Sequence, residues 1–127
     1  EADMIERAKE LHREFDNIEY GVGFIEDAGL QDGEFDVALC YAVLPHIDDI
    51  PGALRVLHRA LTPGGRLYVF HPDDTRTLNE FHSSLNAPVK NDVLPAEEAL
   101  RALISDAGFR VLRYIDEPGL NFIECVK

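Results

Sequence analysis

Hydrophobic and polar residues alternate along the chain with a helical period in four places. Apolar residues spaced three and four apart over residues 4–15 predict an opening helix. A second helix is predicted from Pro51, which suits a first turn, to the Pro-Gly-Gly sequence at 63–65. A third helix is predicted from Pro95 to about residue 107, where Gly108 can cap it. Part of the polar stretch 72–94, over residues 75–84, also fits a helix.

Apolar runs between these helices predict five strands, at residues 18–25, 35–41, 66–71, 109–114 and 120–126. The run 35–41 is apolar almost throughout, as expected of a central parallel strand with helices on both faces. A short turn joins the last two strands, so they are expected to be antiparallel. Strands that alternate with helices predict one α/β domain over residues 1–127, with a mostly parallel sheet.

The charge and the cysteine content of the chain limit which binding partners and which cellular compartment are predicted. The chain has 12 Lys and Arg against 24 Asp and Glu, a net charge of −12, and no cluster of basic residues. The electrostatic field of so negative a chain repels nucleic acid and anionic membranes, so neither is predicted as a partner. The apolar runs are far shorter than the ~20 residues of a membrane-spanning helix. Cys40 and Cys125 lie in separate apolar runs rather than in a disulfide framework, which favours the cytoplasm.

Several motifs occur in an order that resembles one family. Phe35-Asp36-Val37 opens a strand, the loop 44–46 reads Leu-Pro-His, and the sequence 59–65 reads Arg-Ala-Leu-Thr-Pro-Gly-Gly. Together they resemble the class I S-adenosylmethionine-dependent methyltransferases of the type 11/12-like group. The Ala-Gly-Phe turn at 107–109 resembles the turn into the sixth strand of that family. The resemblance implies a three-layer Rossmann-like fold with an antiparallel last strand.

Two family features have no counterpart in this sequence. The Gly-rich turn after the first strand is absent, and so is the acidic residue that ends the second strand and holds the cofactor ribose. We therefore expect the chain to correspond to the C-terminal two-thirds of such a domain, with the first βαβ part missing. Strand 18–25 would then pair directly with strand 35–41, leave a gap filled by a second chain in a homodimer, or be poorly ordered.

The resemblance implies a cofactor site for S-adenosylmethionine. Asp27 and Ala28 match the acidic motif that contacts the adenine, although Asp27 could also be a plain turn residue. Cys40, Tyr41 and Ala42 end a strand where ligands of α/β sheets bind, and they match the segment that lines the sulfonium end of the cofactor. The alternative for Cys40 is a small buried hydrophobe.

Two histidines are candidates for a catalytic base. His46 follows strand 35–41 on a loop at the same end of the sheet, where it could accept a proton or contact the substrate. The alternative is a structural histidine hydrogen-bonded to Asp48 or Asp49. His82 is the second candidate, and it shares a helix face with Asn79.

Polar residues after strand 66–71 form the predicted substrate site. By resemblance, His71, Asn79 and Asn91 lie in the region that covers the active site and selects the substrate, together with Asp92. A solvated surface is the alternative for several of them. His71, His82 and a carboxylate could together hold a metal ion, but their spacing matches no metal signature, so no metal is predicted.

The favoured function is methyl transfer from S-adenosylmethionine to a small-molecule acceptor that the sequence does not identify. The alternative is a non-catalytic interaction or dimerisation module derived from a methyltransferase fold. This chain alone would be inactive if it lacks the cofactor cradle.

Overall fold

The structure is a computed structural model that describes residues 2–85 and 92–127. Its helices are α1 (Ala2–Leu11), α2 (Ile50–Ala60), α3 (Thr75–Ser84) and α4 (Glu97–Asp106), with two short 3₁₀ helices, η1 (Ile25–Asp27) and η2 (Leu44–His46). Its strands are β1 (Phe35–Tyr41), β2 (Leu61–His71), β3 (Arg110–Glu117) and β4 (Leu120–Val126). Within the described ranges, every helix is too short or too polar to cross a membrane.

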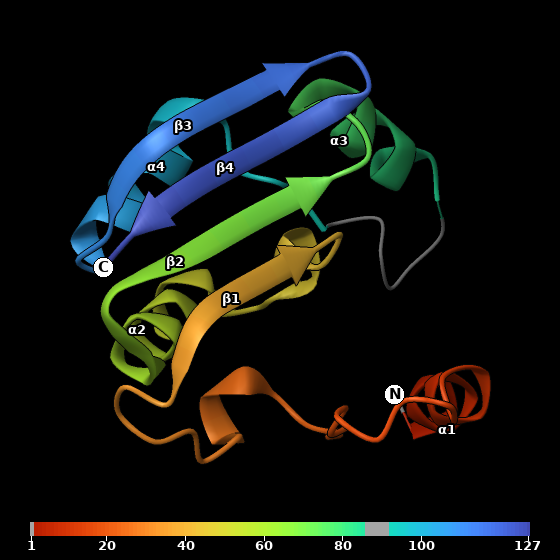
Figure 1. Ribbon diagram of the computed structural model, residues 1–127. Coiled ribbons are helices and arrows are strands. Elements are labelled where there is room, and N and C mark those ends of the chain that lie inside the picture. The colour runs from red at the N-terminus through yellow and green to blue at the C-terminus, as the bar shows by residue number, and fades with distance from the viewer. Residues whose placement is uncertain (1, 86–91) are drawn as a thin grey trace.

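The strands form one sheet in the order β1-β2-β4-β3 (Figure 1). β1 pairs with β2 in parallel, whereas β4 runs antiparallel to both of its neighbours, β2 and β3. Three strands therefore point one way and the last strand points the other way. This arrangement confirms the predicted mixed α/β fold with a reversed last strand, and it fits the Rossmann-like methyltransferase sheet.

The Pro-Gly-Gly sequence brings β2 beside β1. Gly64 has a positive φ of 78°, which glycine adopts without strain. At Gly65, an added Cβ would lie 2.8 Å from the carbonyl oxygen of Thr62 and 3.2 Å from that of Asp36 on β1. Gly65 therefore allows the two strands to approach closely at the start of their pairing.

Helices α2 and α4 lie together on one face of the sheet, which we call the covered face (Figure 1). The Asp49 side chain caps α2 by accepting a hydrogen bond from the Gly52 N–H at 2.9 Å. Alternate residues of β2 and β4 point toward these helices and are buried, which gives both strands a two-residue burial period. The core between the layers contains, among others, Leu54, Leu67, Val69, Leu100, Ile104, Ile123 and Cys125.

The opposite face, which we call the open face, carries no helix in the part of the chain that the structure describes. Val37, Leu39 and Tyr41 of β1 point to it and are 55%, 63% and 58% exposed. The prediction that both faces of strand 35–41 are covered is therefore wrong for these residues. β1 is an edge strand here, because its one partner among the described residues is β2. The described residues thus supply two layers of the predicted three.

The opening segment 2–34 packs differently from the rest, because none of its residues is buried. The predicted strand at 18–25 is wrong, since these residues are irregular and lead into η1. Gly21 and Gly23 weaken the strand preference there. Direct pairing of this segment with β1 is therefore also wrong, while a second chain at this edge stays a prediction.

Candidate functional site

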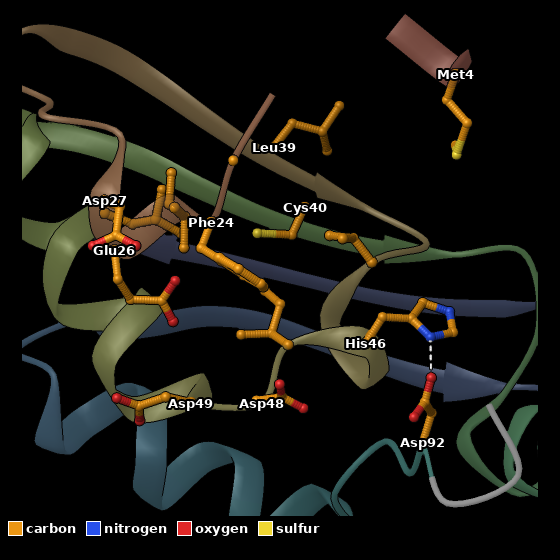
Figure 2. A pocket seen from close by; sticks show the side chains of 15 residues that line it. Met4, Phe24, Glu26, Asp27, Leu39, Cys40, His46, Asp48, Asp49 and Asp92 are labelled. Atoms are coloured by element: carbon orange, nitrogen blue, oxygen red, sulfur yellow. Dashed lines mark hydrogen bonds and ion pairs between the residues drawn. The ribbon is translucent and has the colours of Figure 1, made fainter. Parts of the chain in front are cut away.

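A pocket of about 1010 Å³ opens between the opening segment and the C-terminal end of β1 (Figure 2). Three parts of the chain build most of it, namely the opening segment through η1, the end of β1, and the loop around η2. The lining residues are Met4, Gly23, Phe24, Ile25, Glu26, Asp27, Leu39, Cys40, Val43, His46, Ile47, Asp48, Asp49, Leu57 and Asp92. The pocket therefore lies beyond the carboxyl end of a strand, where ligands of open α/β sheets bind.

Four of the residues predicted from sequence meet in this pocket, namely Asp27, Cys40, His46 and Asp92. Asp27 ends η1, and Cys40 is the buried residue near the end of β1, 6% exposed. Burial raises the pKa of the Cys40 thiol to about 11, so the thiol stays protonated at neutral pH. This protonation supports the alternative of a small buried hydrophobe over a reactive thiol.

The other three predicted cofactor residues do not line this pocket. Ala28 borders a smaller pocket next to it, which also includes Asp27. Tyr41 points to the open face and stacks on Phe70, with ring centroids 5.3 Å apart. Ala42 turns the chain out of β1 with a φ of 48°, which is rare for alanine, and its N–H donates to the Phe70 carbonyl at 2.8 Å.

His46 carries the clearest polar contact of the pocket. Its Nδ1 lies 2.5 Å from Oδ2 of Asp92, 46 positions later in the chain (Figure 2). η2 holds His46 in place because the two residues before it, Leu44 and Pro45, are buried. The predicted partners Asp48 and Asp49 are wrong, since the partner is Asp92. No local signal in the sequence links residues so far apart.

Two side chains of α3 hold the segment 92–94. The Asn79 amide donates to the Leu94 carbonyl at 3.0 Å and accepts from the Leu94 N–H at 2.9 Å. His82 is 7% exposed, and its Nδ1 lies 2.9 Å from the backbone carbonyl oxygen of Asp92. The His46 and His82 rings are in contact, with centroids 5.1 Å apart. Both side chains are thus joined to the His46 site through Asp92 and Leu94.

The remaining predicted residues lie outside the pocket lining or outside the described ranges. His71 is buried, and its Nδ1 pairs with Oδ1 of Asn121 at 3.2 Å. Burial lowers the pKa of His71, which keeps its imidazole neutral near pH 7. Asn91 lies outside the described residues. Within the described ranges, His, Cys, Asp and Glu side chains form no group of three that could hold a metal ion.

The carboxylates that line the pocket give it a negative charge. Five of its lining residues are acidic, and no Lys or Arg among the described residues lines it. The acidic residues are Glu26, Asp27, Asp48, Asp49 and Asp92. Apolar side chains such as Phe24 and Leu39 supply the rest of the wall. Such a lining suits a ligand that combines an apolar ring with a positive charge, and it disfavours an anion.

Comparison with known sequences places this chain in a family. Residues 1–69 match the family model described as a methyltransferase domain. An uncharacterized 37.1 kDa protein in transposon TN4556 of Streptomyces fradiae is 33% identical over 119 residues, which covers 86% of this chain and 34% of that protein. The O-methyltransferase resE of Aspergillus sclerotiorum is 30% identical over 118 residues, covering 84% of this chain and 43% of that enzyme. The chain thus spans less than half the length of these relatives.

Solved structures agree with the sequence comparison. A SAM-dependent methyltransferase from Thermotoga maritima, described as a possible histamine N-methyltransferase, is 25% identical with a TM-score of 0.75. That match covers 96% of this chain and 70% of the other. A SAM-dependent methyltransferase from Aquifex aeolicus has the same fold, with a TM-score of 0.75, 18% identity, and coverage of 99% and 64%. Given the family match, the sheet order and these neighbours, the chain belongs to the class I methyltransferases.

Proposed function

We propose that this site transfers a methyl group from S-adenosylmethionine to a hydroxyl group of a small-molecule acceptor. The observation that carries the proposal is the His46–Asp92 pair on the wall of the pocket that also holds Asp27. A hydroxyl acceptor must lose a proton during methylation, and a histidine paired with a carboxylate is suited to accept it. The related O-methyltransferase of Aspergillus sclerotiorum supports this choice of acceptor atom.

The residues of the pocket fit the adenine and the sulfonium of the cofactor, whereas the Gly-rich turn and the acidic residue for its ribose have no counterpart in this sequence. When bound, S-adenosylmethionine supplies a methyl group that its sulfonium already makes electrophilic. The acidic lining suits the positive charge of that sulfonium, and Phe24 and Ile25 offer apolar surface for the adenine. Asp27 would accept a hydrogen bond from the adenine amino group. Cys40, small and protonated, would pack beside the cofactor without reacting.

The chain's own residues would manage the proton. In the neutral His46 ring, Nδ1–H donates to the Asp92 carboxylate, which leaves the lone pair on Nε2. Nε2 would accept the acceptor's hydroxyl proton, and Asp92 would stabilise the resulting imidazolium. His82 would serve as a neighbour of this base rather than as the base, because it is buried and does not line the pocket.

The test is calorimetric titration of S-adenosylhomocysteine into the 127-residue chain, followed by methyl-transfer assays on a panel of small phenols and alcohols. We expect saturable binding that Asp27→Asn weakens by about tenfold, the effect of one charge-assisted hydrogen bond. His46→Gln is expected to lower kcat by ~10²–10⁴-fold without weakening cofactor binding. His12→Gln, on the exposed opening segment, is the matched control. A folded chain that binds no S-adenosylhomocysteine would overturn the proposal for this chain.

The open face supports a second candidate, a dimerisation module. β1 leaves one edge unpaired among the described residues, and its exposed apolar side chains lie on an equally exposed face. A second copy of the chain, with its own β1 edge, is the partner we propose for this case. Sedimentation equilibrium decides this candidate, because a monomer at high concentration would exclude it. A dimer that Leu39→Lys dissociates would support it.

A further inference from the structure

Among the described residues, the His46 ring makes one side-chain hydrogen bond, to Asp92 of a distant segment, and one ring contact, with His82 on α3. η2 is only three residues long, and the His46 side chain is 39% exposed. Its hydrogen bond within the described ranges is the one to Asp92. Whatever fixes the position of the Asp92 carboxylate therefore also fixes which ring nitrogen of His46 keeps the proton.

Asp92 itself lies on neither a helix nor a strand. The place of its carboxylate must come from the contacts of its backbone and of its neighbour Leu94. Leu94 is fully buried in the core, and its N–H and carbonyl are both bonded to the Asn79 amide. The Asp92 carbonyl oxygen is bonded to Nδ1 of His82. Since a carbonyl only accepts, this Nδ1 carries the hydrogen.

α3, which carries both of these side chains, is itself fastened at its start. The Asp74 side chain caps it, accepting from the Thr77 N–H at 3.1 Å and from the Thr77 hydroxyl at 2.8 Å. The Thr75 N–H donates to the Asp116 carboxylate at the end of β3, at 2.8 Å. These contacts give α3 a fixed position against the sheet, so it can serve as a rigid support.

We propose that Asn79 and His82 are positioning residues, which hold the segment 92–94 so that the Asp92 carboxylate fixes the orientation and tautomer of His46. This inference rests on the proposed function, in which His46 accepts a proton. Asn79 was predicted from sequence to bind substrate, and both polar groups of its amide are instead bonded to Leu94. Asn79 and His82 would act through Asp92 without touching the acceptor.

The test combines the ring ¹⁵N resonances of His46, which report the tautomer, with methyl-transfer kinetics. In the unaltered chain at alkaline pH we expect His46 as the Nδ1–H tautomer. Asp92→Asn is expected to abolish that preference. Asn79→Ala and His82→Ala are expected to shift His46 toward the Nε2–H tautomer and to lower kcat by about tenfold, with KM for the cofactor unchanged. Glu80→Gln, exposed and adjacent on the same helix, is the matched control.

A conservative variant separates positioning from folding. His82→Asn keeps an amide N–H at the place of Nδ1 and should restore the His46 tautomer that His82→Ala loses. If Asn79→Ala unfolds the chain, this pair of His82 variants still decides the question. Unchanged His46 resonances in the alanine variants would overturn the inference, whatever the activity. If the resonances shift but His46→Gln retains full activity, His46 is not the catalytic base, while Asn79 and His82 still position its ring.

Discussion

The two faces of the sheet are built from the same strands, yet they differ in what their side chains contribute. On the covered face, Leu67 and Ile123 are fully buried beneath α2 and α4. On the open face, the residue that follows Ala38 on β1, Leu39, is 63% exposed. The strand pairing sets Leu39 beside Tyr68 and Tyr41 beside Phe70, and Phe70 in turn pairs with Phe122 on β4. Apolar residues therefore occupy both faces, but the described residues supply a layer that excludes water on one face only.

This difference shows that apolar composition and burial are separate properties of a strand. Over most of their length β2 and β4 alternate between buried and half-buried residues, because the helices of the described ranges cover one face of the sheet. A two-sided apolar strand is typical of a sheet enclosed on both faces. The open face, with its row of aromatic side chains, therefore marks a surface suited to a further layer or partner.

The largest difference in stability between the two faces is expected when one leucine on each face is replaced by alanine. Leu67→Ala should lower the free energy of unfolding by about 2–5 kcal/mol, because it leaves a cavity in the core. Leu39→Ala, the same chemical change on the open face, should alter it by about 0.5 kcal/mol or less. Urea unfolding followed by circular dichroism measures both. Equal losses for the two variants would mean that the open face is covered in solution.

The polar end of the covered face provides a second test. Asn121 is fully buried, accepts from His71 and donates to Asp116 at 3.2 Å. Asn121→Leu should lower the free energy of unfolding by about 1–3 kcal/mol, since a buried imidazole N–H loses its acceptor. Phe122→Leu, the next residue on the open face, is the comparison variant and should cost less. A neutral effect of Asn121→Leu would show that water reaches His71.

The sequence predicted the elements of the covered face well, except that α2 ends at Ala60 and β2 begins at Leu61, before the predicted boundary at residues 63–65. The bounds of β1 and α3 agree with the predicted 35–41 and 75–84, and the closing antiparallel pair was expected from its short turn. These elements have strong local signals, because each has a regular apolar period or a capping residue such as Asp74. The Rossmann-like arrangement of the sheet was expected from the family resemblance rather than from local pattern.

The predictions that failed concern segments whose structure depends on contacts with residues far away in the sequence. Residues 18–25 have an apolar composition that fits a strand, but a strand forms only where a partner edge accepts its hydrogen bonds. The site shows the same limit, because Asp27, Cys40 and His46 were predicted from motifs whereas the partner of His46 was not. Asp92 lies 46 positions away, and only the packing of α3 brings it to the pocket.

The pH dependence of stability offers a third test, specific to the covered face. Burial lowers the pKa of His71 below its ordinary value of 6.5. As the pH decreases, the His71 imidazole therefore takes up a proton in the unfolded chain before it does so in the folded chain. The free energy of unfolding keeps its full contribution from neutral His71 above about pH 6.5 and falls below it, by at most about 1.4 kcal/mol per pH unit. Guanidinium unfolding at several pH values measures the slope. His71→Asn, which keeps a donor for Asn121, should flatten it. His58, whose pKa is also lowered, leaves a residual slope in both proteins.

The smallest effect is expected from the aromatic pair on the open face. Tyr41 and Phe70 stack across β1 and β2 with ring centroids 5.3 Å apart and an interplanar angle of 15°. A double-mutant cycle with Tyr41→Ala and Phe70→Ala should give a coupling energy of about 0.2–1 kcal/mol, the usual range for exposed cross-strand pairs. The Ala42 N–H bond to the Phe70 carbonyl is a backbone contact and remains in every variant. A much larger coupling would indicate that the pair is desolvated by a layer on this face. A coupling within this range at low protein concentration, which rises as the concentration increases, would identify that layer as a second copy of the chain.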